Sequence, residues 1–174
     1  MAGKAVVMPT FDEHTGELVG PGGEDYVIIS AEALRRINKQ EELMFGSGSF
    51  VIWYNAGKQV GRQDGKRLAP MTSTMEMQDF AGHLRDTYSM YGWGFIEVGE
   101  VDLKTGEIAF RVTNSPLVRG LLSREPRCWF VRGFAEGLVS EIIGAEVVAT
   151  ELQCQAQGER YCDFRLRWTS EALP

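Results

Sequence analysis

The sequence VRGFAEGLVSEIIGAEVVATELQCQAQGERYCDFRL, residues 131–166, carries the clearest structural pattern of the chain. Its apolar residues first recur every three or four positions, which predicts a helix over residues 127–143. Gly144 is placed to end this helix as its C-cap. Two strands are then expected, over residues 146–154 and 161–168, with a turn between them. This part of the chain therefore predicts a helix that leads into an antiparallel hairpin.

The chain before this segment predicts three more helices and a second hairpin. Ser30 is expected to cap the first of these helices, and Ser73 with Glu76 forms an expected capping box for the third. The helices are predicted over residues 31–45, 49–67 and 74–91, and the strands over residues 95–103 and 107–114. Grouped helices and two hairpins favour an α+β fold, in which an antiparallel sheet is packed with helices, over a parallel sheet.

The predicted helix over residues 49–67 has a glycine at every fourth position, namely Gly57, Gly61 and Gly65. Each glycine inside a helix costs about 1 kcal/mol relative to alanine, so three on one stripe need a reason. One interpretation is that the stripe lets another backbone or a bound ligand approach closely. The other is that the chain leaves the helix after Gly61.

Length and composition are those of one globular domain: 174 residues, 44% hydrophobic and 24% charged. No apolar run approaches 18 residues, and the N-terminal sequence MAGKAVVMPTFDE does not have the pattern of a signal peptide. We therefore expect a cytoplasmic protein that does not enter a membrane. The net charge of −6, with no dense run of Lys or Arg, also argues against direct nucleic-acid binding.

The sequence contains none of the common catalytic fingerprints. A P-loop, a complete G-x-G-x-x-G, a G-x-S-x-G and an H-E-x-x-H are all absent. The two histidines, His14 and His83, lie far apart and match no metal or triad spacing. Nothing in these patterns predicts an enzyme, and no histidine occupies a position that would predict haem binding.

The three cysteines, Cys128, Cys154 and Cys162, all fall in the last part of the chain. An odd number of cysteines argues against a disulfide framework. Cys154 and Cys162 flank a tight turn, and Cys128 begins the preceding helix, so three thiolates could converge as soft ligands for zinc, with Glu151 as a fourth ligand. Residues three apart on a regular strand face opposite ways, so Glu151 and Cys154 can share a metal only if the strand ends or bulges near Gln153. The alternative is that the cysteines are three small buried apolar residues.

The run from Val131 to Leu166 resembles the 4-vinyl reductase domain family, through a helix, a strand, Glu-x2-Cys, a glycine-bearing turn and Cys-x-Phe. The segment NAGKQVGRQ, residues 55–63, is similar to the family's second helix. The resemblance assigns residues 26–168 to a small-molecule-binding domain, with residues 1–25 as an N-terminal extension or hairpin and residues 169–174 as a tail. It implies a fold similar to the ligand-binding domains of nitric-oxide signalling and vesicle-tethering proteins.

The resemblance also implies a metal site. In the aromatic-sensing domains of phenol- and toluene-type activators, which belong to this family, a cysteine followed by Glu-x2-Cys-x7-Cys binds zinc. This chain has Cys128 and then Glu151, Cys154 and Cys162 in the same spacing. Four protein ligands leave no open coordination position, so the implied zinc is structural.

The function that the resemblance implies is binding or sensing of a small apolar, aromatic or hydrocarbon ligand, without catalysis, by a protein that forms a homodimer. We expect aromatic side chains to line the cavity between helices and sheet: Trp53, Tyr54, Trp93, Phe95, Phe110 and Phe134. One alternative is a dimeric assembly or scaffold protein with a structural cavity. A less favoured alternative is an enzyme of tetrapyrrole vinyl reduction, for which the sequence lacks a nicotinamide or flavin fingerprint.

Overall fold

The computed structural model describes residues 8–102 and 105–169. Its helices and strands follow in the order β1 (Thr10–Phe11), β2 (Leu18–Val19), α1 (Ala31–Phe45), η1 (Gly46–Gly48), α2 (Ser49–Leu68), η2 (Ala69–Ser73), α3 (Met77–Met90), β3 (Phe95–Asp102), β4 (Glu107–Thr113), α4 (Trp129–Ile143), β5 (Val148–Gln153), η3 (Gln155–Gln157) and β6 (Cys162–Arg167). Residues 1–7, 103–104 and 170–174, which include part of the predicted N-terminal extension and tail, lie outside the described residues.

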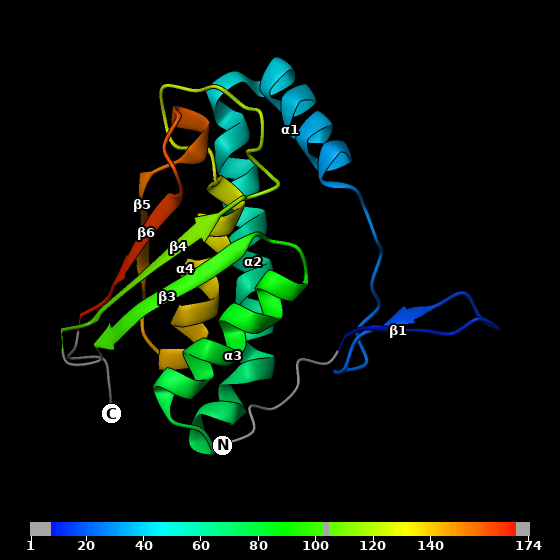
Figure 1. Cartoon of the computed structure of the whole chain (residues 1–174), viewed down its shortest axis with the longest axis vertical. Helices are drawn as coiled ribbons and strands as arrows, with labels where there is room; N and C mark the ends of the chain where they lie inside the picture. The colour runs from blue at the N-terminus through cyan, green and yellow to red at the C-terminus, as the bar shows by residue number, and fades with distance from the viewer. Residues whose placement is uncertain (1–7, 103–104, 170–174) are drawn as a thin grey trace.

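The main sheet has four strands in the order β3-β4-β6-β5, and every neighbouring pair is antiparallel. Figure 1 shows α4 against this sheet, α2 on the far side of α4, and α3 beside β3. The predicted α+β fold with an antiparallel sheet packed with helices is therefore confirmed. A separate pair of short strands, β1 and β2, forms a hairpin near the N-terminus.

The helix ends test the predicted capping residues. Ser30 caps α1 as expected, since its side chain accepts a hydrogen bond from the backbone N–H of Ala33. Gly144 ends α4 in the left-handed conformation, with φ +67°. The capping box of Ser73 and Glu76 is wrong: Ser73 belongs to η2, where its hydroxyl donates to the carbonyl of Pro70, and no side chain caps α3.

Glycines on both helices bring α2 and α4 into backbone contact. A Cβ at Gly57 or Gly61 of α2 would fall on the carbonyl oxygen of Phe130 or Phe134, and Gly133 and Gly137 of α4 face α2 in the same way. The helix does not end after Gly61 but continues to Leu68. The glycine stripe therefore serves close approach of another backbone, as the first interpretation held.

A buried carboxylate joins α2, α4 and β5. Glu136, which is 3% exposed, accepts hydrogen bonds from the hydroxyl of Tyr54, the ammonium of Lys58 at 2.6 Å and the N–H of Ala149 at 2.9 Å. Burial alone would raise the pKa of Glu136, but the N–H of Ala149, Lys58 and Tyr54 outweigh it and hold the pKa below its usual range. The ionised carboxylate is thus the form that this network stabilises.

Replacing Glu136 with glutamine is expected to destabilise the fold by about 1–3 kcal/mol at neutral pH, because a charged acceptor with three donors is lost. The lowered folded-state pKa means that the contribution of Glu136 is present above the unfolded-state pKa of about 4.3 and is lost as the pH falls through the folded-state pKa. Urea unfolding at several pH values should therefore show the two proteins converging below about pH 4. Glu146→Gln, at an exposed position, is the matched control. A gap that does not change with pH would contradict this role.

Candidate functional site

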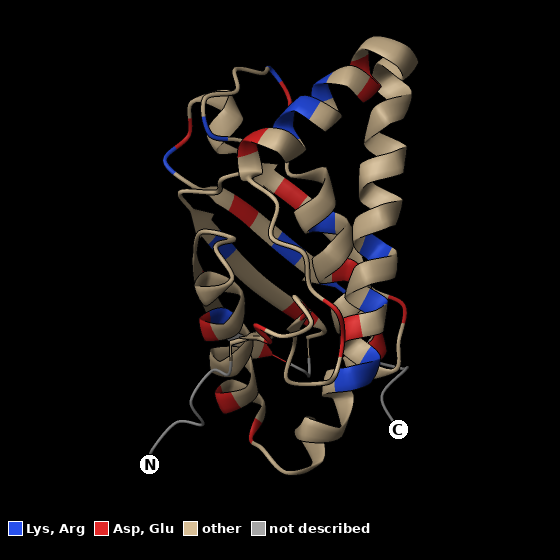
Figure 2. Cartoon of the chain, turned by 90° about the vertical axis from the view of Figure 1, so that its right-hand side faces the viewer, with Lys and Arg blue, Asp and Glu red and all other residues tan. Residues whose placement is uncertain are grey.

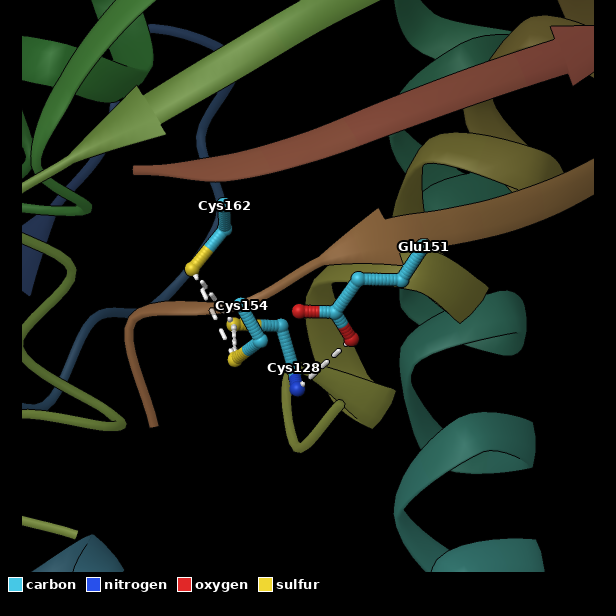
Figure 3. A group of neighbouring side chains, drawn as sticks. All are labelled: Cys128, Glu151, Cys154 and Cys162. Carbon is cyan, nitrogen blue, oxygen red and sulfur yellow. Dashed lines mark hydrogen bonds between the residues drawn. The ribbon is translucent and has the colours of Figure 1, made fainter. Parts of the chain in front are cut away.

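Four side chains that are far apart in the sequence meet at the start of α4. Cys128 precedes α4, Glu151 lies on β5, Cys154 follows β5, and Cys162 begins β6. All four residues are buried, and one possible ligand atom of each lies within 4.8 Å of the others. Figure 3 shows the four side chains pointing toward one another from these separate elements. The structure thus places the four predicted metal-ligating residues in one cluster that can hold a metal ion.

The three sulfur atoms form a nearly regular triangle. The Sγ atoms of Cys128 and Cys162 are 3.4 Å apart, those of Cys154 and Cys162 are 3.7 Å apart, and those of Cys128 and Cys154 are 3.8 Å apart. All three are free cysteines, since a disulfide would need a separation of about 2.05 Å. The sulfurs therefore surround a common point rather than forming a bridge.

The carboxylate of Glu151 completes the cluster. Its Oε2 accepts a hydrogen bond of 3.0 Å from the backbone N–H of Cys128. Its Oε1 is buried and has no hydrogen-bond partner within the described part of the chain. Figure 3 shows this oxygen directed at the sulfur atoms. A buried carboxylate oxygen without a partner is costly, and a cation at the centre of the cluster would satisfy it.

An irregularity in β5 brings Glu151 and Cys154 to the same side. The pairing of β5 with β6 shifts between Glu151 and Gln153, so that Glu151 faces Phe164 and Gln153 faces Asp163. The strand then ends, and Cys154 adopts an extended backbone before η3. This is the interruption that the spacing of the two ligands required.

The electrostatics of the cluster also suit a cation. Burial raises the pKa of Glu151 to about 9, and the nearby Cys154 thiolate raises it further. Hydrogen bonds from the thiols of Cys128 and Cys162 lower the pKa of Cys154, and the backbone N–H of Arg127 adds to this effect. Without a cation the cluster concentrates its negative charge on Cys154. A bound divalent ion would favour the charged form of every member.

The basic residues near the cluster act mainly through their backbone. Arg127 donates its backbone N–H to the Sγ of Cys154 at 3.5 Å, while its guanidinium pairs with Glu42 of α1 and lies over the ring of Trp129. Gln155 likewise donates its N–H to the Sγ of Cys162 at 3.3 Å. Such N–H···S bonds orient the sulfurs and lower their negative charge.

A second feature is an apolar cavity of about 110 Å³ between the sheet and the helices α3 and α4. Its walls are aliphatic and aromatic side chains of α3, β3, β4, α4 and β6. Few of the lining side chains carry an N–H or O–H group: Arg85, Tyr88 and Trp93. Arg85 is paired with Asp86, and the hydroxyl of Tyr88 donates to Asp64. The cavity therefore offers a ligand mainly apolar contact.

The six predicted lining residues are divided between the cavity and other places. Trp93, Phe110 and Phe134 line the cavity. Trp53 packs edge-to-face on Phe130 outside it, and Tyr54 is engaged with Glu136. Phe95 is 60% exposed because it points to the opposite face of β3 from the lining residue Ile96.

The largest group of lining residues that the sequence analysis missed is on α3. Met77, Phe80, Ala81, Leu84 and Tyr88 all face the cavity. Their spacing of three or four positions is the signal that could have identified them, because it defines one apolar stripe on a helix.

The comparisons with known proteins agree with this geometry. Residues 108–168, which include all four residues of the cluster, match the family model of the 4-vinyl reductase domain. No curated protein matches the chain. Within the described residues, no helix is long and apolar enough to cross a membrane.

Three solved structures share the fold. The phenol-responsive sensory domain of the transcription activator PoxR with phenol has a TM-score of 0.81 and 18% identity, over 92% of this chain and 84% of that one. A trafficking protein particle complex subunit 3 from Naegleria fowleri, covalently bound to palmitic acid, has a TM-score of 0.58 and 16% identity, over 83% and 95%. An H-NOX protein from S. oneidensis has a TM-score of 0.56 and 12% identity, over 86% and 83%. The predicted likeness to nitric-oxide-signalling and vesicle-tethering folds is therefore confirmed, and residues 108–168 of this chain belong to the 4-vinyl reductase domain family.

Proposed function

We propose that this protein is a non-catalytic domain that binds or senses a small apolar ligand and is stabilised by a structural zinc ion. The observation that carries this proposal is the apolar cavity enclosed by the sheet, α3 and α4. A cavity lined by aliphatic and aromatic side chains excludes water and favours ligands that need few hydrogen bonds. The shared fold with a phenol-responsive sensory domain supports a sensing role.

The size and polarity of the cavity favour a hydrocarbon of about one aromatic ring. Its volume of about 110 Å³ is slightly below the engineered apolar cavities of about 150 Å³ that take up benzene. A phenolic hydroxyl would lose its hydration there, because the hydroxyl of Tyr88 is already directed at Asp64. We therefore expect toluene to bind more tightly than phenol.

Zinc is the metal that best suits the cluster. Zinc prefers thiolate, imidazole and carboxylate ligands in a tetrahedron, with Zn–S bonds of about 2.3 Å and thus sulfurs about 3.8 Å apart. The three Sγ–Sγ distances of 3.4–3.8 Å are close to this value. Cys128, Glu151, Cys154 and Cys162 would hold the ion and join the start of α4 to the β5–β6 hairpin. Three free thiols also agree with our placement of the protein in the reducing cytoplasm.

We further propose that the protein forms a homodimer through α1 and the first turns of α2. No residue of α1 is buried, and Figure 2 shows that the upper turns of α2 carry no charge. Exposed apolar side chains gather on α1, α2 and the segment before α1: Val27, Ile28, Ile29, Ile37, Leu43, Met44, Phe45, Phe50, Val51, Ile52 and Val60. Monomers rarely expose so large an apolar surface, and a stable interface needs about 800 Å² per partner. A second copy of the chain, with the same apolar surface, is the occupant we propose.

Toluene at about 100 times its dissociation constant is expected to raise the melting temperature by about 5–10 °C, because it binds only the folded state. Phenol at the same concentration should give a smaller shift. Replacing Ala135, which lines the cavity, with leucine should abolish the toluene shift by filling the space. Ala56→Leu, at an exposed position of α2, should leave the shift unchanged. A full shift in the Ala135 variant would mean that the ligand binds elsewhere.

A glutamate at Leu43 is expected to convert the dimer to a monomer at micromolar concentration, because it would bury a charge in the apolar interface. Sedimentation velocity measures the change directly. Leu122→Glu is the matched control, since Leu122 is 94% exposed and lies in the loop before α4. A wild-type protein that sediments as a monomer at every concentration would refute the interface.

A further inference from the structure

A chain of polar contacts leads from the wall of the cavity to the N-terminal segment. Tyr88 lines the cavity, and its hydroxyl donates to Oδ2 of Asp64 at 2.8 Å. The other oxygen of Asp64 is 3.3 Å from the guanidinium of Arg67, and Arg67 pairs with Glu24 at 3.4 Å. Three elements, α3, α2 and the loop after β2, are thereby connected through one residue of the cavity wall.

The electrostatics of this chain keep its members in the required forms. Burial raises the pKa of Tyr88, and the neighbouring carboxylate of Asp64 raises it further, so the hydroxyl stays protonated and acts as the donor. Burial would lower the pKa of Arg67, but Asp64 and Glu24 outweigh this effect and raise it. The guanidinium is therefore a permanent positive charge between the two carboxylates.

Aromatic rings form a second connection beside the polar one. Tyr88 packs edge-to-face on Tyr91 with ring centroids 6.3 Å apart, and Tyr91 packs in the same way on Tyr26 at 5.9 Å. Tyr26 also donates a hydrogen bond of 3.4 Å to Glu24. Both routes thus end on the same short segment, residues 24–26.

This short segment is where the N-terminal part of the chain is attached to the domain. Gly20 and Gly22 allow the loop to close over Glu24, because a Cβ at either position would fall within 2.8 Å of the Glu24 side chain. Directly afterwards, Val27 and Ile28 are each 87% exposed. Figure 1 shows the chain running from this point to α1 at the other end of the molecule. The contacts of Glu24 and Tyr26 therefore set where the connection to α1 begins.

We propose that Tyr88 couples occupancy of the cavity to the attachment of residues 20–26, through Asp64, Arg67 and Glu24. This inference rests on the proposed function, because it requires a ligand in the cavity. A ligand of about the size of the cavity presses on the side chains of α3, including Tyr88, and shifts the hydroxyl away from Asp64. The ligand then has different contacts in the attached and released states, which is the condition for shifting the balance between them. Release of residues 20–26 alters the path to α1 and thereby the surface proposed for dimer formation.

Hydrogen–deuterium exchange of the full chain, with and without toluene, tests this coupling. In the wild type, toluene is expected to speed exchange in residues 20–26 about fivefold, which corresponds to the loss of one hydrogen bond of about 1 kcal/mol. Tyr88→Phe keeps the aromatic ring in the cavity wall and removes only the donor. It should exchange about fivefold faster in this segment without toluene, bind toluene with unchanged affinity, and show no further change when toluene is added.

Two more variants separate the coupling from general loss of structure. Arg67→Gln interrupts the chain away from the cavity and should reproduce the Tyr88→Phe result. Tyr161→Phe, which removes a hydroxyl from a residue that stacks on Arg111 at the sheet, should behave as the wild type. Toluene binding without any change in residues 20–26, or a wild-type response in Tyr88→Phe, would overturn the proposal. If toluene fails to bind at all, the proposed function fails; unchanged ligand-free exchange in both Tyr88→Phe and Arg67→Gln would then refute the attachment separately.

Discussion

Replacing Cys154 with serine is expected to abolish metal binding and to lower the free energy of unfolding by about 4 kcal/mol or more, in the range seen when a structural metal is lost. Cys154 is 0% exposed and lies within 3.8 Å of both other sulfurs, so its loss leaves the ion with three ligands and a gap in its shell. Elemental analysis of untagged protein should find one zinc per chain in the wild type and none in the variant. The melting temperature should fall by about 8–16 °C.

Metal removal from the wild type is the control for this variant. Wild type treated with a chelator should become as unstable as Cys154→Ser, and added zinc should restore the wild type but not the variant. This comparison separates the loss of the ion from the loss of a buried sulfur. Wild type that binds no zinc even after zinc is added, with a variant of equal stability, would show that the cysteines are only buried thiols.

The sequence was sufficient for the unit that builds the metal cluster because its signals are local. Apolar spacing and Gly144 located α4, and the turn between Cys154 and Cys162 located the β5–β6 hairpin. The position of Glu151 could be stated only as a condition, since a strand bulge leaves no unique pattern in the residues. The register shift between Glu151 and Gln153 is set by pairing with β6, which is a tertiary contact.

The cavity was harder to predict because it depends on which face each element turns inward. A shift of one residue on β3 exchanges Phe95 for Ile96, and no single-strand pattern of aromatic residues fixes that choice. Tyr54 was assigned to the cavity, yet its partner Glu136 lies 82 residues away and holds it on another side of α4. Attention to aromatic residues alone also overlooked the aliphatic stripe of α3.

The third helix shows a different limit of sequence reasoning. Ser73 and Glu76 have the spacing of a capping box, but Pro70 and the carbonyl it leaves free favour the short helix η2, which takes up the hydroxyl of Ser73. The local signal was real, and a competing local structure used the same side chain.

Alanine at Gly61 is expected to cost about 3 kcal/mol or more, although alanine is the better helix former by about 1 kcal/mol. A Cβ at this position would fall on the backbone carbonyl of Phe134, and a backbone atom of α4 cannot move without moving the helix. Phe134 and Leu138 both line the cavity, so a displacement of α4 should also change its shape. Urea unfolding gives the stability, and the toluene shift of the melting temperature reports on the cavity.

Gly82→Ala is the matched control because it makes the same substitution inside α3, where the nearest atom to a new Cβ is the end of the Arg85 side chain at 3.9 Å. There the intrinsic preference for alanine acts alone, so the variant should be as stable as the wild type or more stable by up to about 1 kcal/mol. The opposite signs at the two glycines would separate helix propensity from helix–helix contact. Equal effects at both positions would mean that α2 and α4 are not in the close backbone contact described above, and the wall that α4 gives to the cavity would then be unsupported.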